Sequence, residues 1–221
     1  MKLPQSLDAV SARSVEEIRG TARAVQANVV TLRVFFERRE PGQTLSDIRT
    51  PAPGPVRRNR DRLLDTETLK SYSPQELIVR LRQVWGEFCA LCWLFPHVDP
   101  QAPIDFDQAS EGPVFRCIND ARSKLDEVQT HLWRLLHEQR LRHDPDAKKD
   151  PTFQQDAEIA VTHRLRIYGV NVARATDEQV FHAACEYAGM LAALRWALDD
   201  RWAWEGPGIM NLTITAPPPV R

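Results

Sequence analysis

Two cysteines separated by two residues, Cys89 and Cys92, form the first pattern with a potential for chemistry. A zinc ribbon would need a second such pair, and thioredoxin-like redox chemistry would need the pair at the start of a helix that follows a strand. The pair lies instead inside a helical pattern, and Cys117 and Cys185 would complete four ligands only if three helices converged there. We therefore interpret all four cysteines as reduced, buried thiols and predict no cofactor.

Glutamate and histidine recur at a spacing of four in the last helical segment, at Glu178, His182 and Glu186, and Glu127 and His131 repeat this spacing. Carboxylate-bundle metal sites use Glu-x-x-His, with a spacing of three. We therefore interpret these residues as solvent faces of amphipathic helices, where such pairs give modest support to the helix. No metal ligand is assigned, and a metal-dependent helical-bundle enzyme remains a further alternative.

A short basic run, Arg57, Arg58, Arg60 and Arg62, lies in a proline-rich segment without helical periodicity. Guanidinium groups pair well with phosphates, so an accessory nucleic-acid-binding subunit of a nucleoprotein complex is an alternative function. The run also contains Asp61 and has no interleaved aromatic residue. We therefore expect residues 40–72 to form a mobile, solvated loop.

Trp202 and Trp204 stand where the last helical pattern ends, next to Arg201. Most of the six tryptophans are expected to fill the core. An exposed tryptophan beside an arginine at a helix end is typical of an anchor for a protein partner, because these residue types dominate binding hot spots. The three residues are therefore the predicted partner-binding site.

No catalytic constellation is found. The sequence has no G-x-x-x-x-G-K-[ST], G-x-G-x-x-G or G-x-S-x-G motif, and only nine glycines. His137-Glu138 is followed by His143, which is too distant for the zinc-protease pattern. We assign no catalytic residue and no small-molecule substrate, and expect that the protein is not an enzyme.

The helix that must organise the chain runs from Thr176 to Glu205. Thr176 and Gln179 form a capping box, and Gly206-Pro207 is a stop signal. Apolar residues cover much of its circumference, and its alanines and Gly189 keep the surface thin. These features predict a central helix with neighbours on more than one side.

Three further long patterns predict its neighbours, and a shorter helix is predicted from Asp150 to about Arg166. The long helices are expected from Ser14 to about Arg39, from Ser73 to Phe95, and from Ser110 or Pro113 to about Arg142. In the first, apolar residues alternate at spacings of three and four without a miss. This stripe indicates a helix facing its own core or, alternatively, a seam for another chain.

Composition is that of an ordinary soluble globular protein, with 221 residues, 29 basic against 30 acidic residues and a net charge of -1. No global charge points to nucleic acid or an anionic membrane. There is no signal-peptide core at the N-terminus and no apolar run long enough to cross a bilayer. We expect a cytoplasmic protein.

The predicted fold is all-α: a single bundle of four to five helices over residues 1–221, with a long proline-rich crossover loop and a C-terminal tail at 206–221. The function predicted from this reading is a non-catalytic interaction or scaffolding protein that self-associates or joins a larger assembly. Two heptad-like stripes and the wide central helix supply the apolar surface on which that prediction depends.

Overall fold

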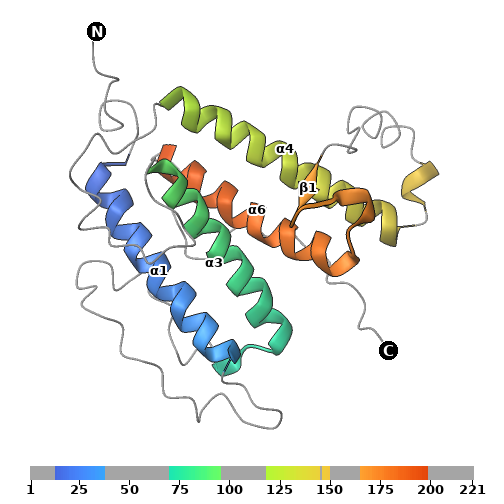
Figure 1. The fold of residues 1–221 in the computed structure, drawn as a ribbon, viewed down its shortest axis with the longest axis horizontal. Coiled ribbons are helices and arrows are strands. Elements are labelled where there is room, and N and C mark those ends of the chain that lie inside the picture. The colour runs from blue at the N-terminus through green and yellow to red at the C-terminus, as the bar shows by residue number, and fades with distance from the viewer. Residues whose placement is uncertain (1–12, 38–69, 96–117, 145, 150–164, 199–221) are drawn as a thin grey trace.

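The computed structural model describes residues 13–37, 70–95, 118–144, 146–149 and 165–198, and their fold is all-α, as predicted. The long α-helices in these ranges are α1 (Val15–Glu37), α3 (Pro74–Leu94), α4 (Ile118–His143) and α6 (Asp177–Leu198) (Figure 1). Lys70 and Ser71, at the end of the predicted loop of residues 40–72, are also helical, and residues 40–69 of that loop lie outside the described residues. The smaller elements in these ranges are two strands and two 3-10 helices: β1 (Arg166–Ile167), β2 (Val170–Asn171), η5 (Ala147–Lys149) and η7 (Val172–Arg174).

Capping boxes begin three of the helices, at the starts that the sequence predicts. In each, a serine or threonine hydroxyl accepts a hydrogen bond from the backbone N–H three residues on, and the side chain at that position accepts one from the cap N–H. The pairs are Ser14 with Glu17, Ser73 with Glu76, and Thr176 with Gln179. Local chemistry at these positions therefore determines where the helices start.

The helices lie in the spatial order α1, α3, α6, α4. α6 packs against both α3 and α4, and α1 packs against α3, as Figure 1 shows. The prediction that α6 has neighbours on more than one side is therefore confirmed for residues 177–198. The predicted continuation to Glu205 lies outside the described residues.

The heptad-like stripes face the interior of this chain. In α1 the stripe residues Ile18, Ala22, Val25 and Leu32 are buried in the core. In α4 the corresponding buried residues are Ala121, Val128, Leu132 and Leu135. Because α3 packs against α1, the stripe of α1 is an internal face, and the alternative of a seam for another chain loses its support.

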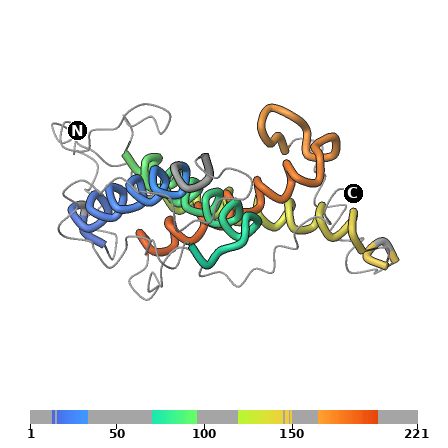
Figure 2. Tube along the Cα trace, turned by 90° about the horizontal axis from the view of Figure 1, so that it is seen from below, coloured from blue at the N-terminus to red at the C-terminus, as the bar shows by residue number. Residues whose placement is uncertain are grey.

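The two inner helices, α3 and α6, are adjacent in both views (Figure 1; Figure 2) and touch through their backbones. A Cβ atom added at Gly86 would overlap the carbonyl oxygen of Glu186, and one added at Gly189 would overlap the carbonyl oxygen of Gln83. Each glycine is near the middle of its helix. The helices therefore cross near their midpoints, at a separation that only glycine permits there.

A short hairpin begins at Arg166, so the helix predicted from Asp150 to about Arg166 does not include this last residue, while the turn that Gly169 predicts is present. Arg166 pairs with Asn171 and Ile167 with Val170 in an antiparallel ladder. The turn between the strands consists of Tyr168 and Gly169, with φ values of 49° and 77°. Such a turn normally selects asparagine, aspartate or glycine at its first position, so tyrosine gives no recognisable signal. Residues 150–164 lie outside the described residues.

The close backbone contacts at Gly86 and Gly189 predict a large cost for adding a single methyl group at either position. We expect Gly86→Ala and Gly189→Ala each to lower the free energy of unfolding by about 1–3 kcal/mol, because separating the helices outweighs the gain in helix propensity of about 1 kcal/mol. Urea denaturation measures the change. Gly20→Ala, in α1 and away from this crossing, is the control. Equal stability of all three variants and the wild type would contradict the close approach.

Candidate functional site

The residues predicted to bind partners lie outside the part of the chain that the structure describes. This applies to Arg201, Trp202 and Trp204, and to the basic run Arg57, Arg58, Arg60 and Arg62. Their roles remain predictions.

Cys89, Cys92 and Cys185 are free thiols within α3 and α6. Burial raises the pKa of Cys89 and of Cys185 to about 12, which keeps both protonated and poorly nucleophilic. Across the described residues, no group of three or more histidine, cysteine, aspartate or glutamate side chains is placed to hold a metal ion. For these three residues, the structure agrees with the interpretation of reduced, packed thiols.

The Glu178, His182 and Glu186 row is not the plain solvent face that its spacing suggested. The side chain of Glu178 is 73% exposed, whereas that of His182 is 13% exposed. Burial lowers the pKa of His182, which favours the neutral imidazole. The row therefore runs from solvent at Glu178 into the contact between α6 and α3.

Glu186 is the centre of a polar cluster formed by α3, α6 and the hairpin. Its Oε1 accepts a hydrogen bond from Nη1 of Arg82 at 2.8 Å. The guanidinium carbon of Arg82 lies 6.0 Å from the centroid of the Tyr168 ring. Burial raises the pKa of Glu186, although Arg82 and the hydroxyl of Tyr168 oppose this shift. We call these three residues the hairpin clamp.

Tyr168 holds this position in an unfavourable backbone conformation. Its φ of 49° lies in the left-handed region, which costs a residue with a Cβ atom roughly 1–2 kcal/mol. Its side chain is also 48% exposed, so burial of the ring offsets only part of this cost. The β1–β2 ladder closes the turn, and the interactions of Tyr168 with Glu186 and Arg82 help to hold it.

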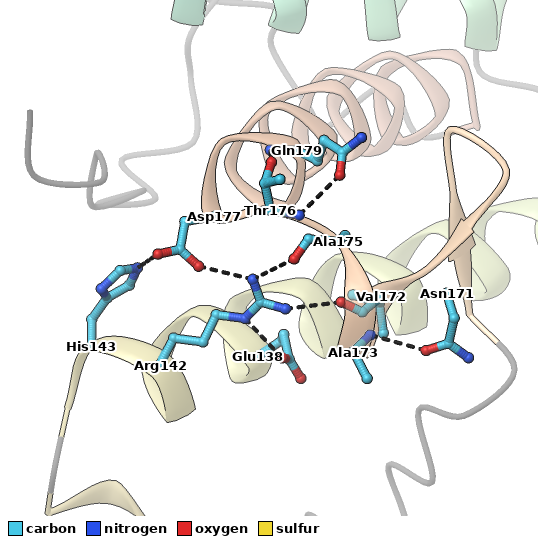
Figure 3. A network of polar contacts seen from close by, with 10 residues as sticks. All are labelled: Glu138, Arg142, His143, Asn171, Val172, Ala173, Ala175, Thr176, Asp177 and Gln179. Atoms are coloured by element: carbon cyan, nitrogen blue, oxygen red, sulfur yellow. Dashed lines mark hydrogen bonds and ion pairs between the residues drawn. The ribbon is translucent and has the colours of Figure 1, made fainter. Parts of the chain in front are cut away.

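A second cluster, centred on Arg142, fixes the other end of the same connection (Figure 3). Its guanidinium donates to Glu138 at 2.8 Å, to Asp177 at 2.8 Å, to the carbonyl of Ala175 at 2.8 Å and to the carbonyl of Val172 at 2.9 Å. Arg142 lies in the last turn of α4, and Asp177 is the first residue of α6. One planar cation therefore joins the end of α4, η7 and the start of α6.

Neither cluster brings a nucleophile together with a general base. The thiols near Glu186 are held protonated, and Nε2 of His182 is 3.9 Å from Oε1 of Glu178, beyond a hydrogen bond. On α4, Nδ1 of His131 is likewise 3.9 Å from Glu127, and burial lowers its pKa. What these side chains do in the described part of the chain is to position elements.

Trp133, on α4, is an exposed aromatic residue that the sequence did not single out. Its side chain is 41% exposed, and its ring centroid lies 5.1 Å from that of His137, one helical turn further on. The sequence does contain an indication that Trp133 is exposed. Trp133 directly follows Leu132 of the buried stripe, and consecutive residues of a helix do not lie on the same face. The side of α4 that carries Trp133 is therefore a candidate interaction surface.

No protein-family model, curated protein sequence or solved structure matches the chain. Within the described residues, no helix has both the length and the apolar character needed to cross a membrane.

Removing the Arg142 guanidinium should separate α4 from the start of α6. We expect Arg142→Met to lower the free energy of unfolding by about 2–4 kcal/mol, because several charge-assisted hydrogen bonds are lost and Glu138 keeps a largely buried carboxylate. Arg142→Lys should recover only part of this, since an ammonium cannot reach all four acceptors. Arg140→Ala, which breaks an exposed pair with Asp144, is the control, with an effect below about 1 kcal/mol in urea denaturation. Equal effects at both positions would contradict the assigned role.

The turn strain can be separated from the hydroxyl contact with two substitutions at one position. Tyr168→Phe removes the hydroxyl and keeps the ring beside Arg82, whereas Tyr168→Asn removes both but tolerates a positive φ. We therefore expect the asparagine variant to be more stable than the phenylalanine variant by about 1 kcal/mol in thermal or urea denaturation. A phenylalanine variant as stable as the wild type would show that the hydroxyl contact contributes nothing.

Proposed function

We propose that the protein is a non-catalytic helical interaction protein that self-associates or joins a larger assembly. The observation that carries this proposal is Trp133, a large aromatic side chain that remains 41% exposed on α4. Tryptophan is the residue type most enriched in binding hot spots, because it buries a large apolar area on association. The partner surface in this proposal is the Trp133 side of α4.

Two features of α4 favour this surface. α4 is at one end of the helix order and, of the long described helices, packs chiefly against α6 through its buried stripe. The contact with His137 also restrains the Trp133 ring before any partner binds. A restrained side chain loses less conformational entropy on binding, so more of the burial energy remains for association.

The predicted alternatives rest on other parts of the chain. A nucleic-acid-binding role depends on Arg57, Arg58, Arg60 and Arg62, and a gel shift at rising salt would test it, because phosphate contacts weaken steeply with salt. Elemental analysis would test a metal-dependent enzyme. We propose the cytoplasm as the compartment, which suits the free thiols of Cys89, Cys92 and Cys185.

Loss of Trp133 should weaken association without unfolding the bundle. We expect the wild-type chain to show a mass above that of the monomer. Sedimentation velocity of purified protein measures this for self-association, and size-exclusion chromatography of an extract of its source cell measures it for a larger assembly. Trp133→Ala should shift it toward the monomer, because the central anchor of the surface is removed.

Val30→Ala is the matched control for this experiment. Val30 is 51% exposed on α1, at the other end of the helix order, so its truncation should leave association unchanged. A wild-type chain that is monomeric in both settings, or equal loss of association in the two variants, would contradict the proposal.

A further inference from the structure

Glu87, on α3, is a carboxyl group inside the apolar core. It is only 2% exposed, and its buried Oε2 atom has no hydrogen-bond partner. The neighbouring core residues of α3 on the same side are Val84, Leu91 and Leu94, one or two turns away. Leaving a buried polar atom unpaired is unfavourable, and leaving a buried charge unpaired is far more so.

The charged groups around Glu87 offer little compensation. Arg80, two turns earlier on α3, lowers its pKa, but among the described residues no ion pair joins them, and the buried Nε of Arg80 is itself without a hydrogen-bond partner. The buried polar residues of α1, Thr21 and Asn28, are uncharged. α6 brings Glu186 to the same crossing, where its carboxylate bonds to Arg82 and interacts with Tyr168.

From this geometry we propose that Glu87 is a proton-dependent switch that controls local opening of the packing of α3 against α1 and α6. In the closed form, seen in this structure, the carboxyl is neutral. In the open form it is a carboxylate, hydrated by water and balanced by the charge of Arg80. Closing therefore takes up one proton, and opening releases it.

The sign of the pH dependence follows from the two forms. Burial raises the pKa of Glu87 from 4.5 to about 8 in the closed form, while the open form keeps the ordinary value. Below the lower value both forms are protonated, so pH has no effect. Between the two values the open form has lost its proton and the closed form has not, so opening becomes about tenfold more favourable per pH unit. Above the higher value the effect levels off.

Arg80 is placed to set the strength of this switch. It lies seven residues before Glu87 and so shares its side of α3. Both side chains are long enough to approach each other once the packing loosens. Removing the cation should make the carboxylate less stable in the open form, so a higher pH is needed to reach the same degree of opening.

Hydrogen exchange followed by mass spectrometry tests the proposal on the full chain. After division by the intrinsic exchange rate at each pH, we expect the opening constant for amides of α1 and α3 to rise about 100-fold between pH 5.5 and 7.5, one proton being released. In Glu87→Gln, which keeps the shape and cannot ionise, the constant should change less than about threefold. Arg80→Met should retain the slope, with less opening at each pH between the two pKa values, where the open form carries the carboxylate.

A flat wild-type profile, or the same slope in Glu87→Gln, would overturn the proposal. Should the glutamine variant fail to fold, Glu87→Met serves in its place, and carbon-13 NMR of the glutamate carboxyls in the wild type gives an independent answer. One carboxyl must then titrate above pH 7 in the folded protein, and its signal must be absent from Glu87→Met, because the pKa of Glu186 is raised as well. If every carboxyl titrates near its ordinary pKa, Glu87 is not the switch.

Discussion

The backbone contact between α3 and α6 is the constraint on which the rest of the structure depends. At Gly86 and Gly189 the two inner helices have no side chain between them, so neither can shift without a large loss of packing. The same contact brings the backbone of Glu186 against α3, which lets Arg82 reach its carboxylate. It also carries Glu87 into the interior beside Gly189. The hairpin clamp and the buried carboxyl are thus two consequences of one close crossing.

The connection between α4 and α6 is held from two sides, and the two clamps differ in kind. Arg142 uses one rigid cation to satisfy two backbone carbonyls and two carboxylates, which favours a single geometry at the start of α6. Tyr168 holds the hairpin tip through a polar contact that opposes backbone strain. The first clamp is a source of rigidity. At Tyr168 the polar contact is offset by the backbone strain at the same residue. The hairpin tip is therefore held less firmly than the start of α6.

The starts of the helices and the buried stripes were predictable because each depends on residues close in sequence, as with Ser73 and Glu76. The close contact at Gly86 was not predictable, since a glycine within a helical pattern does not reveal which other helix packs against it. The burial of Glu186 against α3 was equally unpredictable. A spacing of four places residues in one row of a helix but does not show which element packs against that row. Gly169 predicts a turn before α6, but the pairing of strands on either side of it is not predictable, because Tyr168 occupies a position where hairpin turns favour another residue type. In each case the deciding partner is distant in sequence.

Because both apolar stripes are buried inside the bundle, a binding role cannot use them as a free surface. A seam already filled by α3 or α6 offers nothing to another chain while the bundle is closed, so binding through the closed form has to use side chains such as Trp133 that packing leaves exposed. The open form is different, because separating α1 from α3 would uncover the apolar faces of both helices. A neutral carboxyl at Glu87 favours the closed form, so the proton on this residue and the availability of those faces are linked. On this proposal, the apolar surface that the chain exposes depends on pH through a residue that is only 2% exposed in the closed form.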